Sequence, residues 1–346
     1  MSNQTSSNLS TQKKKNRSRL VFAMLAVMLV LAAGVFLAFT TRVVSVSGRG
    51  ELYVLEANRT HLGTLLIEEG AAAIFRENSH WIGPIISKQG TLTVEKKVTI
   101  TGPVFLFSNG LQLGENARVQ GSVYLFSGNL KLQPGASIRH NAVLFAGDLS
   151  LGQGANIREK VVSFYGNVNL QEKASLQGDV VLFFGNMKIG DQAAVYGELL
   201  SFAGGLEMAS KAILDDDAVL FFGKVHLFPE AQVKGNVIVT EGNATLEAQS
   251  TITGKLYLNP VSNLGRLNMS SEAQISRGVF KPENIDSIAG MHVAGWFARQ
   301  LLKFIMLPVA VVCLLMALMF YLGRGARSRK EKRVAQARYA ELSHQP

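Results

Sequence analysis

The residues that most often carry catalytic or metal-binding chemistry are scattered along this sequence. Metal sites need histidine, cysteine or carboxylate side chains at short spacings, and catalytic sites need a base within reach of a nucleophile. No such spacing joins the histidines, which are His61, His80, His140, His226, His292 and His344. The single cysteine, Cys313, lies within an apolar run, so one chain can form neither a disulfide nor a cysteine-based metal site.

An acidic run at Asp215, Asp216 and Asp217 is the densest group of potential metal ligands. Carboxylate oxygens are ligands for Ca²⁺, so a calcium site is conceivable there. The run does not recur at the equivalent positions of the neighbouring repeats, and we therefore expect an exposed turn. The sequence also lacks a phosphate-binding loop and a nucleophile elbow. We predict that the protein is not an enzyme and that it has no catalytic residue, metal site or cofactor.

The strongest pattern in the sequence is a repeat of nineteen residues. Its first column is aromatic and consists of Phe107, Phe126, Phe145, Phe164, Phe183, Phe202 and Phe221. Two residues later stands a glycine column, which consists of Gly128, Gly147, Gly166, Gly185, Gly204, Gly223 and Gly242. Ten residues after each phenylalanine is a small residue, such as Ala193, and two further on is an aliphatic one, such as Val195. Several columns that keep one spacing without an insertion predict a repeat architecture.

Within one repeat, the residues alternate as in a β-strand. Met187 and Ile189 flank Lys188, and the same alternation recurs nineteen residues before and after. Gly185-Asn186 and Gly197 are expected to form turns, since Gly and Asn accept a positive φ. Three short strands with three corners describe one coil of a β-solenoid, whose coils stack about 4.8 Å apart. We predict an all-β fold with about eight or nine coils between Val104 and Leu258.

The strand that contains the phenylalanine column is apolar on both of its faces. In Val180-Val181-Leu182-Phe183, alternate residues point to opposite sides of the sheet. We favour Val180 and Leu182 inside and Phe183 outside, because Val and Leu fit a narrow interior; the reverse orientation is the alternative. The predicted ladder of seven phenylalanines, from Phe107 to Phe221, is our candidate interaction face for a partner, a second copy or lipid. Alternatively, another part of the chain, such as residues 42–100 or 262–298, covers it.

Charge and hydropathy indicate two membrane spans. The net charge is +10 and 47% of the 346 residues are hydrophobic. Leu20 to Phe39 and Phe304 to Leu322 contain no charged residue, and about twenty residues are enough to cross a bilayer. The excess positive charge lies in the two tails that flank these runs, and not on the repeat, so we predict no nucleic-acid partner. A cleaved signal peptide is the alternative for the first run.

These patterns predict a two-pass protein of the cell membrane. Basic flanks stay in the cytoplasm, so both termini are expected inside and the solenoid outside. The predicted segments are a basic tail (1–19), a transmembrane helix (20–40), an irregular β cap (41–103), the β-solenoid (104–260), a linker that could include an interfacial helix (261–300), a second transmembrane helix (301–323) and a second basic tail (324–346).

The repeat resembles that of the bactofilins and related polymer-forming proteins. The matching segments are Gly178-Asp179-Val180-Val181, Gly235-Asn236-Val237-Ile238 and Gly242-Asn243-Ala244-Thr245-Leu246. The resemblance covers under half of the chain. It implies a right-handed triangular β-helix, end-to-end polymerisation, no bound nucleotide and a scaffolding role. Compared with that family, this chain adds two predicted transmembrane helices.

Two functions fit these expectations. The first is a membrane-anchored structural scaffold, a homo-oligomer or polymer in contact with lipid, that self-assembles or organises an envelope component. The alternative is an extracytoplasmic module that binds a polysaccharide or an envelope protein through a face of the solenoid.

Overall fold

The computed structural model describes residues 42–258 and 266–280. All regular elements in these two ranges are β-strands, and neither range contains a helix with the length and hydrophobicity of a membrane span. The chain divides into a compact unit of residues 1–283, which contains all the described strands, and a second unit of residues 284–346. The two predicted tails, both predicted transmembrane helices and the predicted interfacial helix lie outside the described residues.

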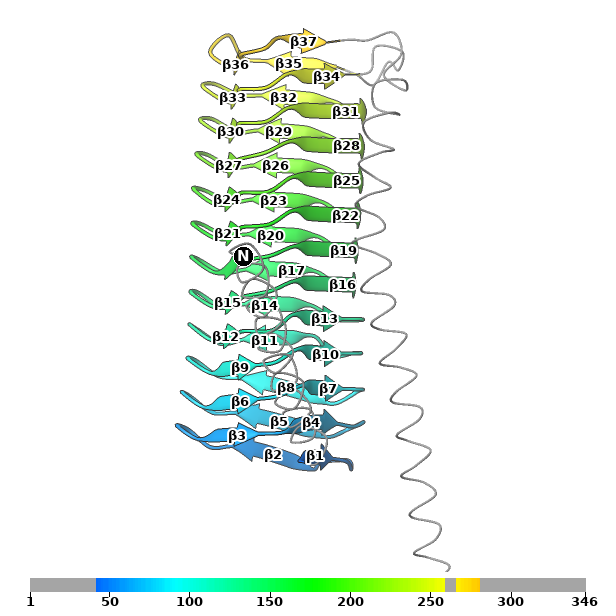
Figure 1. Ribbon diagram of the computed structural model, residues 1–346. Helices are drawn as coiled ribbons and strands as arrows, with labels where there is room; N and C mark the ends of the chain where they lie inside the picture. The colour runs from blue at the N-terminus through cyan, green and yellow to red at the C-terminus, as the bar shows by residue number, and fades with distance from the viewer. Residues whose placement is uncertain (1–41, 259–265, 281–346) are drawn as a thin grey trace, which may run out of the picture. The chain divides into compact units, whose positions relative to one another are not determined.

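The strands form three parallel sheets, called A, B and C here, which make a β-solenoid (Figure 1). Sheet A consists of β1 (Val43–Val46), β4 (Thr64–Ile67), β7 (Ile85–Ser87), β10 (Val104–Leu106), β13 (Val123–Leu125), β16 (Ala142–Ala146), β19 (Val161–Tyr165), β22 (Val180–Phe184), β25 (Leu199–Ala203), β28 (Ala218–Phe222), β31 (Val237–Glu241), β34 (Leu256–Leu258) and β37 (Val279–Phe280). Sheet B consists of β2 (Leu52–Leu55), β5 (Ala72–Phe75), β8 (Thr91–Val94), β11 (Leu111–Leu113), β14 (Leu130–Leu132), β17 (Leu149–Leu151), β20 (Val168–Leu170), β23 (Met187–Ile189), β26 (Leu206–Met208), β29 (Val225–Leu227), β32 (Ala244–Leu246) and β35 (Leu267–Met269). Sheet C consists of β3 (Thr60–Leu62), β6 (His80–Ile82), β9 (Thr99–Thr101), β12 (Arg118–Val119), β15 (Ser137–Ile138), β18 (Asn156–Ile157), β21 (Ser175–Leu176), β24 (Ala194–Val195), β27 (Ile213–Leu214), β30 (Gln232–Val233), β33 (Thr251–Ile252) and β36 (Gln274–Ile275).

Each coil contributes one strand to each sheet, and its alternating apolar residues point into one shared core. In β23, Met187 and Ile189 are buried and Lys188 between them is exposed. The small and aliphatic columns of the repeat, such as Ala193 and Val195, are also fully buried. A coil cannot bury these side chains alone, so stacking on neighbouring coils is what removes them from water. The predicted all-β solenoid with coils of about nineteen residues is confirmed.

The solenoid is longer than the predicted range of 104–260. Strand β10 pairs with β13 on one side and with β7 on the other, so the expected boundary at residue 103 lies inside continuous sheets. Coils near both ends are longer than the regular repeat of nineteen residues. Their paired residues on sheet A are Val43 and Thr64, Leu65 and Ile85, and Leu256 and Val279. Because these coils are longer, the columns with a spacing of nineteen residues do not continue to the ends of the solenoid, and the sequence pattern does not show where it begins and ends.

The residues predicted to form turns do lie between strands, but two of them lack the positive φ given as the reason. Gly185 has a φ of 145°, as its place at a corner requires. Asn186 and Gly197 are not among the residues with positive φ. A Cβ atom on Gly197 would lie 2.6 Å from the backbone nitrogen of Asp179 in the preceding coil, so close approach of two coils explains this glycine. Asn186 instead forms hydrogen bonds between coils, as described below.

Aromatic side chains close the N-terminal end of the core. Trp81 is fully buried and stacks on Phe75, with ring centroids 5.5 Å apart. On the side of the first coil, His61 stacks on Trp81 at 4.7 Å and Tyr53 meets it edge-on at 6.1 Å. Burial raises the pKa of the Tyr53 hydroxyl. Terminal repeats need polar groups on their outer side, and the polar tips of His61 and Tyr53 meet that need.

Candidate interaction surface

The seven phenylalanines predicted to form a ladder do stack along sheet A. Successive ring centroids from Phe107 to Phe221 are between 4.6 and 5.2 Å apart, and the rings are parallel within 11°. The spacing follows from the sheet, because residues nineteen apart occupy the same position in hydrogen-bonded strands. We call these seven residues the Phe ladder.

The Phe ladder lies on the outer side of sheet A. Val180 and Leu182 are fully buried members of the core, whereas Phe183 lies outside the core cluster and is partly exposed. The same division holds in the neighbouring strands. The favoured orientation is therefore confirmed, and Val and Leu fill the interior of the regular coils.

A second apolar column runs parallel to the Phe ladder on the same face. The strand pairing aligns Leu66, Ile86, Phe105, Tyr124, Val143, Val162, Val181, Leu200, Val219, Ile238, Tyr257 and Phe280. Four central members, Val143, Val162, Val181 and Leu200, are only 2–5% exposed. The sequence indicated this column only in the regular coils. The apolar pairs Ile85-Ile86 and Val104-Phe105 keep the spacing of nineteen residues and were the signal for its extension, whereas the longer coil before them shifts Leu66 by one residue.

Three exposed aromatic residues follow directly after members of the Phe ladder in the chain. Tyr165 is 59% exposed, Phe184 50% and Phe222 58%, and all three end strands of sheet A. The rings of Tyr165 and Phe184 stack at 4.9 Å. The doublets Phe183-Phe184 and Phe221-Phe222 were visible in the sequence, although the exposure of their second member depends on where the strand ends. We call these three residues and the Phe ladder together the aromatic strip.

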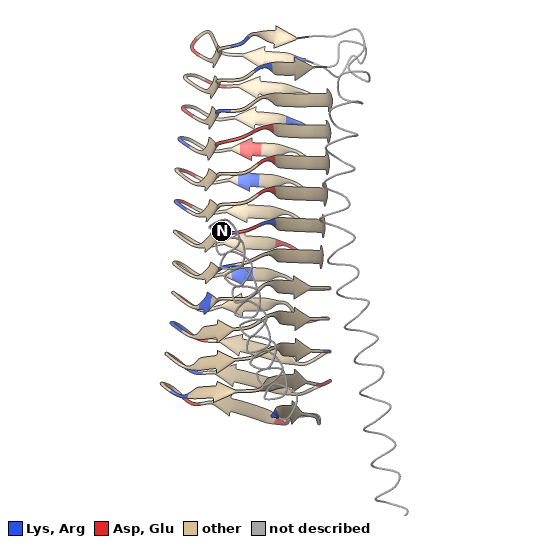
Figure 2. Cartoon of the chain, in the orientation of Figure 1, with Lys and Arg blue, Asp and Glu red and all other residues tan. Residues whose placement is uncertain are grey.

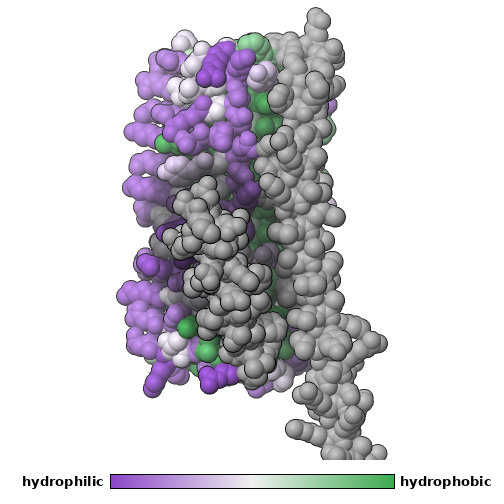
Figure 3. Space-filling view, in the orientation of Figure 1, coloured by the Kyte–Doolittle hydropathy of each residue, from purple (hydrophilic) through white to green (hydrophobic). Residues whose placement is uncertain are grey.

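Sheet A differs from the other two sheets in charge. Glu241 is the only charged residue within its described strands. The outer columns of the other sheets are mostly polar, with Gln112, Lys131, Ser150, Asn169, Lys188, Glu207 and His226 on sheet B, and Arg118, Ser137, Asn156 and Ser175 on sheet C. Figure 2 shows the charged residues mainly at the turns, and Figure 3 shows hydrophilic residues along the side opposite sheet A. Only sheet A presents an apolar outer face.

The chain segments that were expected to cover this face extend the solenoid instead. Residues 43–101 form β1 to β9, and residues 267–280 form β35 to β37. Their side chains lengthen the apolar face, which runs from Leu66 to Phe280. The remainder of the second expected segment, residues 281–298, lies outside the described residues.

Two columns of Asn and Asp side chains tie neighbouring coils together. In the first column, the Oδ1 atom of Asn167 accepts a hydrogen bond from the backbone N–H of Asn186 at 2.9 Å, and Asp148 accepts one from Asn167 at 2.7 Å. In the second column, Asp217 accepts hydrogen bonds from the backbone and the side chain of Asn236. These side chains accept hydrogen bonds from N–H groups of the following coil, which point back toward them at the corners, where no strand continues.

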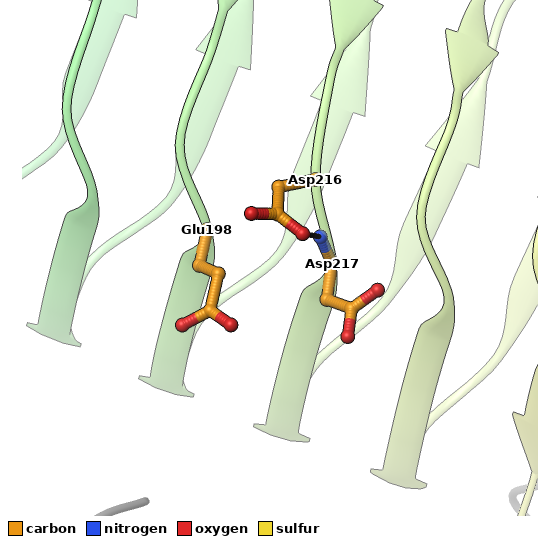
Figure 4. Close-up of side chains that lie close together, drawn as sticks. All are labelled: Glu198, Asp216 and Asp217. Atoms are coloured by element: carbon orange, nitrogen blue, oxygen red, sulfur yellow. Dashed lines mark hydrogen bonds between the residues drawn. The ribbon is translucent and has the colours of Figure 1, made fainter.

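One residue of the acidic run, Asp217, belongs to this second column. Carboxylate oxygens of Glu198, Asp216 and Asp217 lie within 4.8 Å of one another (Figure 4). Asp216 accepts a hydrogen bond from the backbone of Asp217 at 2.9 Å, and Asp215 pairs with Lys234. The position of Asp217 in the Asn/Asp column explains its carboxylate without a metal ion. The cluster by itself is not evidence of a cation site.

The two histidines on repeat positions form hydrogen bonds with carboxylates at the surface. His140 lies 2.8 Å from Glu159, and His226 lies 2.6 Å from Glu247. His226 also stacks on Phe228, with ring centroids 4.1 Å apart. The structure therefore does not bring these histidines together with each other, and each pairs with a carboxylate of the adjacent coil.

No family model, curated protein or solved structure matches this chain. The resemblance to bactofilins therefore rests on the repeat segments alone. The functional argument rests on the aromatic strip and on the architecture that positions it.

Proposed function

We propose that this protein is a membrane-anchored structural scaffold whose solenoid lies outside the cytoplasm and assembles with itself or with an envelope component. The observation that carries the proposal is the unbroken stack of coils, in which every inner strand of three parallel sheets pairs with the strands before and after it. Such a stack is a stiff rod, because bending it would break hydrogen bonds in all three sheets together. Stiffness and a fixed length are properties that a scaffold needs.

The membrane part of the proposal is supported by the sequence. The runs at 20–39 and 304–322 are free of charge and long enough to span a bilayer, and both are flanked by basic tails. The resemblance to bactofilins supports the scaffolding role. Their implied end-to-end polymerisation is one way in which this solenoid could assemble, and contact through sheet A is another.

The proposal is tested by electron microscopy of the full-length protein in mild detergent. We expect filaments, rings or other regular particles that contain several rods.

The placement of the solenoid outside the cytoplasm is tested in whole cells with the variants Cys313→Ser and Lys188→Cys combined, since Lys188 is exposed on sheet B. We expect a membrane-impermeant thiol reagent to label this cysteine before the cells are opened. Dispersed single rods together with an unlabelled cysteine would reject the scaffold and its placement.

A binding module is the second candidate, and the exposed aromatic residues favour it. Tyr165, Phe184 and Phe222 are at least half exposed, and Tyr196 is 52% exposed at another corner. Flat aromatic rings in a row can stack on the sugar rings of a polysaccharide. Dispersed single rods in the microscope, together with labelling of the cysteine in whole cells, would favour this function over self-assembly.

A further inference from the structure

One column of side chains on the outside of the solenoid carries opposite charges at its two ends. It consists of the residue that directly follows each strand of sheet C, whose backbone N–H donates to the same position of the preceding coil. Five consecutive members, in chain order, are Arg139, Arg158, Gln177, Tyr196 and Asp215. We call these five residues the corner column, because they stand where each coil turns from sheet C towards sheet A.

The corner column lies at the surface of the chain. Each of its members follows a buried strand residue such as Ile138 or Ile157, so alternation along the strand directs the next side chain outward. Arg139, Arg158 and Gln177 are exposed, and Tyr196 is 52% exposed. These side chains are therefore accessible to a partner.

The two arginines of the corner column are not neutralised by acids of the described coils. The nearest acids in the sequence have other partners: Glu159 lies 2.8 Å from His140, and Asp179 pairs with Lys160. Neither arginine forms an ion pair with a residue in the described ranges. One end of the column therefore presents two guanidinium groups to solvent.

The other end of the corner column is acidic. Asp215 pairs with Lys234 of the next coil. Asp216 beside it is exposed, and it accepts a hydrogen bond from the backbone N–H of Asp217 but forms no ion pair with a described residue (Figure 4). One lysine against several carboxylates leaves this end with excess negative charge.

A partner with charge of a single sign does not match both ends. An anionic polymer or an anionic lipid surface that contacts Arg158 would be repelled by the acidic run three coils further on. A second copy in parallel orientation would place like charges opposite each other. A second copy in antiparallel orientation places the basic end of each column against the acidic end of the other, and charge complementarity therefore favours this partner.

The order of residues in the corner column is self-complementary about Gln177. A twofold axis through this coil places Gln177 opposite its own copy and Arg158 opposite Tyr196, whose aromatic ring attracts a cation. The same axis places Arg139 opposite Asp215 and Asp216. Because the coils of both copies repeat at about 4.8 Å, all five positions come into register together.

We propose that two copies of this chain associate side by side and antiparallel through the corner column, with their twofold axis at Gln177. The inference rests on the proposed scaffold function and specifies one contact through which its rods assemble. The column spans four coil intervals, or about 19 Å. Such a short contact gains from a high local concentration, which anchoring both copies in one membrane provides.

Disulfide cross-linking of the full-length protein in mild detergent tests the position of the axis. In a Cys313→Ser background, Gln177→Cys places two thiols opposite each other, and Lys188→Cys places one on sheet B as the matched control. With copper–phenanthroline as the oxidant, we expect a covalent dimer from Gln177→Cys and at least tenfold less from Lys188→Cys, because a disulfide needs Cα atoms within about 7 Å. Equal cross-linking of the two variants would overturn the proposal.

Charge reversal tests the orientation in the same Gln177→Cys protein. Asp216→Lys should lower the yield of the covalent dimer at least fivefold, because it places a lysine opposite Arg139. Adding Arg139→Glu should restore the yield, since the two charges are then exchanged. Adding Lys188→Glu to Asp216→Lys gives the same net charge and should not restore it. All these positions are exposed, so the melting temperatures should agree within about 2 °C.

The results separate this contact from the scaffold function as a whole. Regular particles in the microscope without the Gln177 cross-link would overturn the corner contact and keep the scaffold. An unchanged yield with Asp216→Lys, or equal restoration by Arg139→Glu and Lys188→Glu, would overturn the antiparallel pairing of charges. Restoration by Arg139→Glu alone would support it, because net charge is the same in both double variants.

Discussion

Asn167 illustrates how single side chains hold successive coils in register. Its Oδ1 atom accepts a hydrogen bond from the backbone of Asn186, and its own backbone and side-chain amides donate to Asp148. The side chain thus links three coils at a corner where the sheets are interrupted. An apolar residue at this position would leave the N–H group of Asn186 without this acceptor.

We therefore predict that Asn167→Ala lowers the free energy of unfolding by about 1–2 kcal/mol. The matched control is Asn169→Ala, two residues further on, where the side chain lies on the outer face of β20. That change should cost less than about 0.5 kcal/mol. Chemical denaturation of the full-length protein and both variants measures the difference. Equal losses would show that the Asn/Asp column does not stabilise the stack.

The glycine column determines how the chain passes from one strand to the next at a corner of each coil. Gly147, Gly166, Gly185 and Gly204 have φ values between 133° and 158°, which side chains rarely allow. A Cβ atom on each would also overlap the carbonyl oxygen of the glycine one coil earlier. The column combines a backbone requirement with a packing requirement, which explains the glycine at this corner in the coils from Gly128 to Gly242.

We predict that Gly185→Ala destabilises the solenoid by about 3 kcal/mol or more, since it adds a steric overlap to backbone strain. Gly154→Ala provides the control, because Gly154 has a φ of 65° and no atom lies within 4 Å of the added Cβ. Lys173 and Gln192 occupy the same turn position in later coils with similar φ values. The control should cost about 1–2 kcal/mol. Thermal and chemical denaturation report both values, and a smaller loss for Gly185→Ala than for Gly154→Ala would contradict this account.

At the scale of the whole molecule, the solenoid is modular because each coil pairs only with its two neighbours. Its core is continuous, and its length is set by the number of coils. One complete coil can therefore be removed without exposing the core, provided that the removed segment has the length of one repeat.

We predict that deletion of residues 167–185, which joins Gly166 to Asn186, leaves a folded solenoid that is shorter by about 4.8 Å. Deletion of residues 167–176 is the control, and it should abolish cooperative unfolding because it removes half a coil and shifts every following side chain. Circular dichroism during thermal unfolding distinguishes the two. Comparable damage from both deletions would show that the coils are not interchangeable units.

The sequence by itself determined the regular part of this fold. A period of nineteen residues places Phe107 to Phe221 in one column, and alternation within Met187-Lys188-Ile189 separates inside from outside. These features are local and repeated, so they can be read without knowing which strands pair. The stacking of the Phe ladder followed from the same period.

Only the tertiary structure decided the remaining features. The longer coils near both ends keep their strands in the three sheets while their columns move out of phase, so the ends of the solenoid were hidden. Asn186 and Gly197 resemble turn residues in sequence, but their roles depend on atoms of the preceding coil. The exposure of Phe184 depends on where β22 ends. Each of these outcomes is set by contacts between residues about one coil apart, and a linear pattern does not specify such contacts.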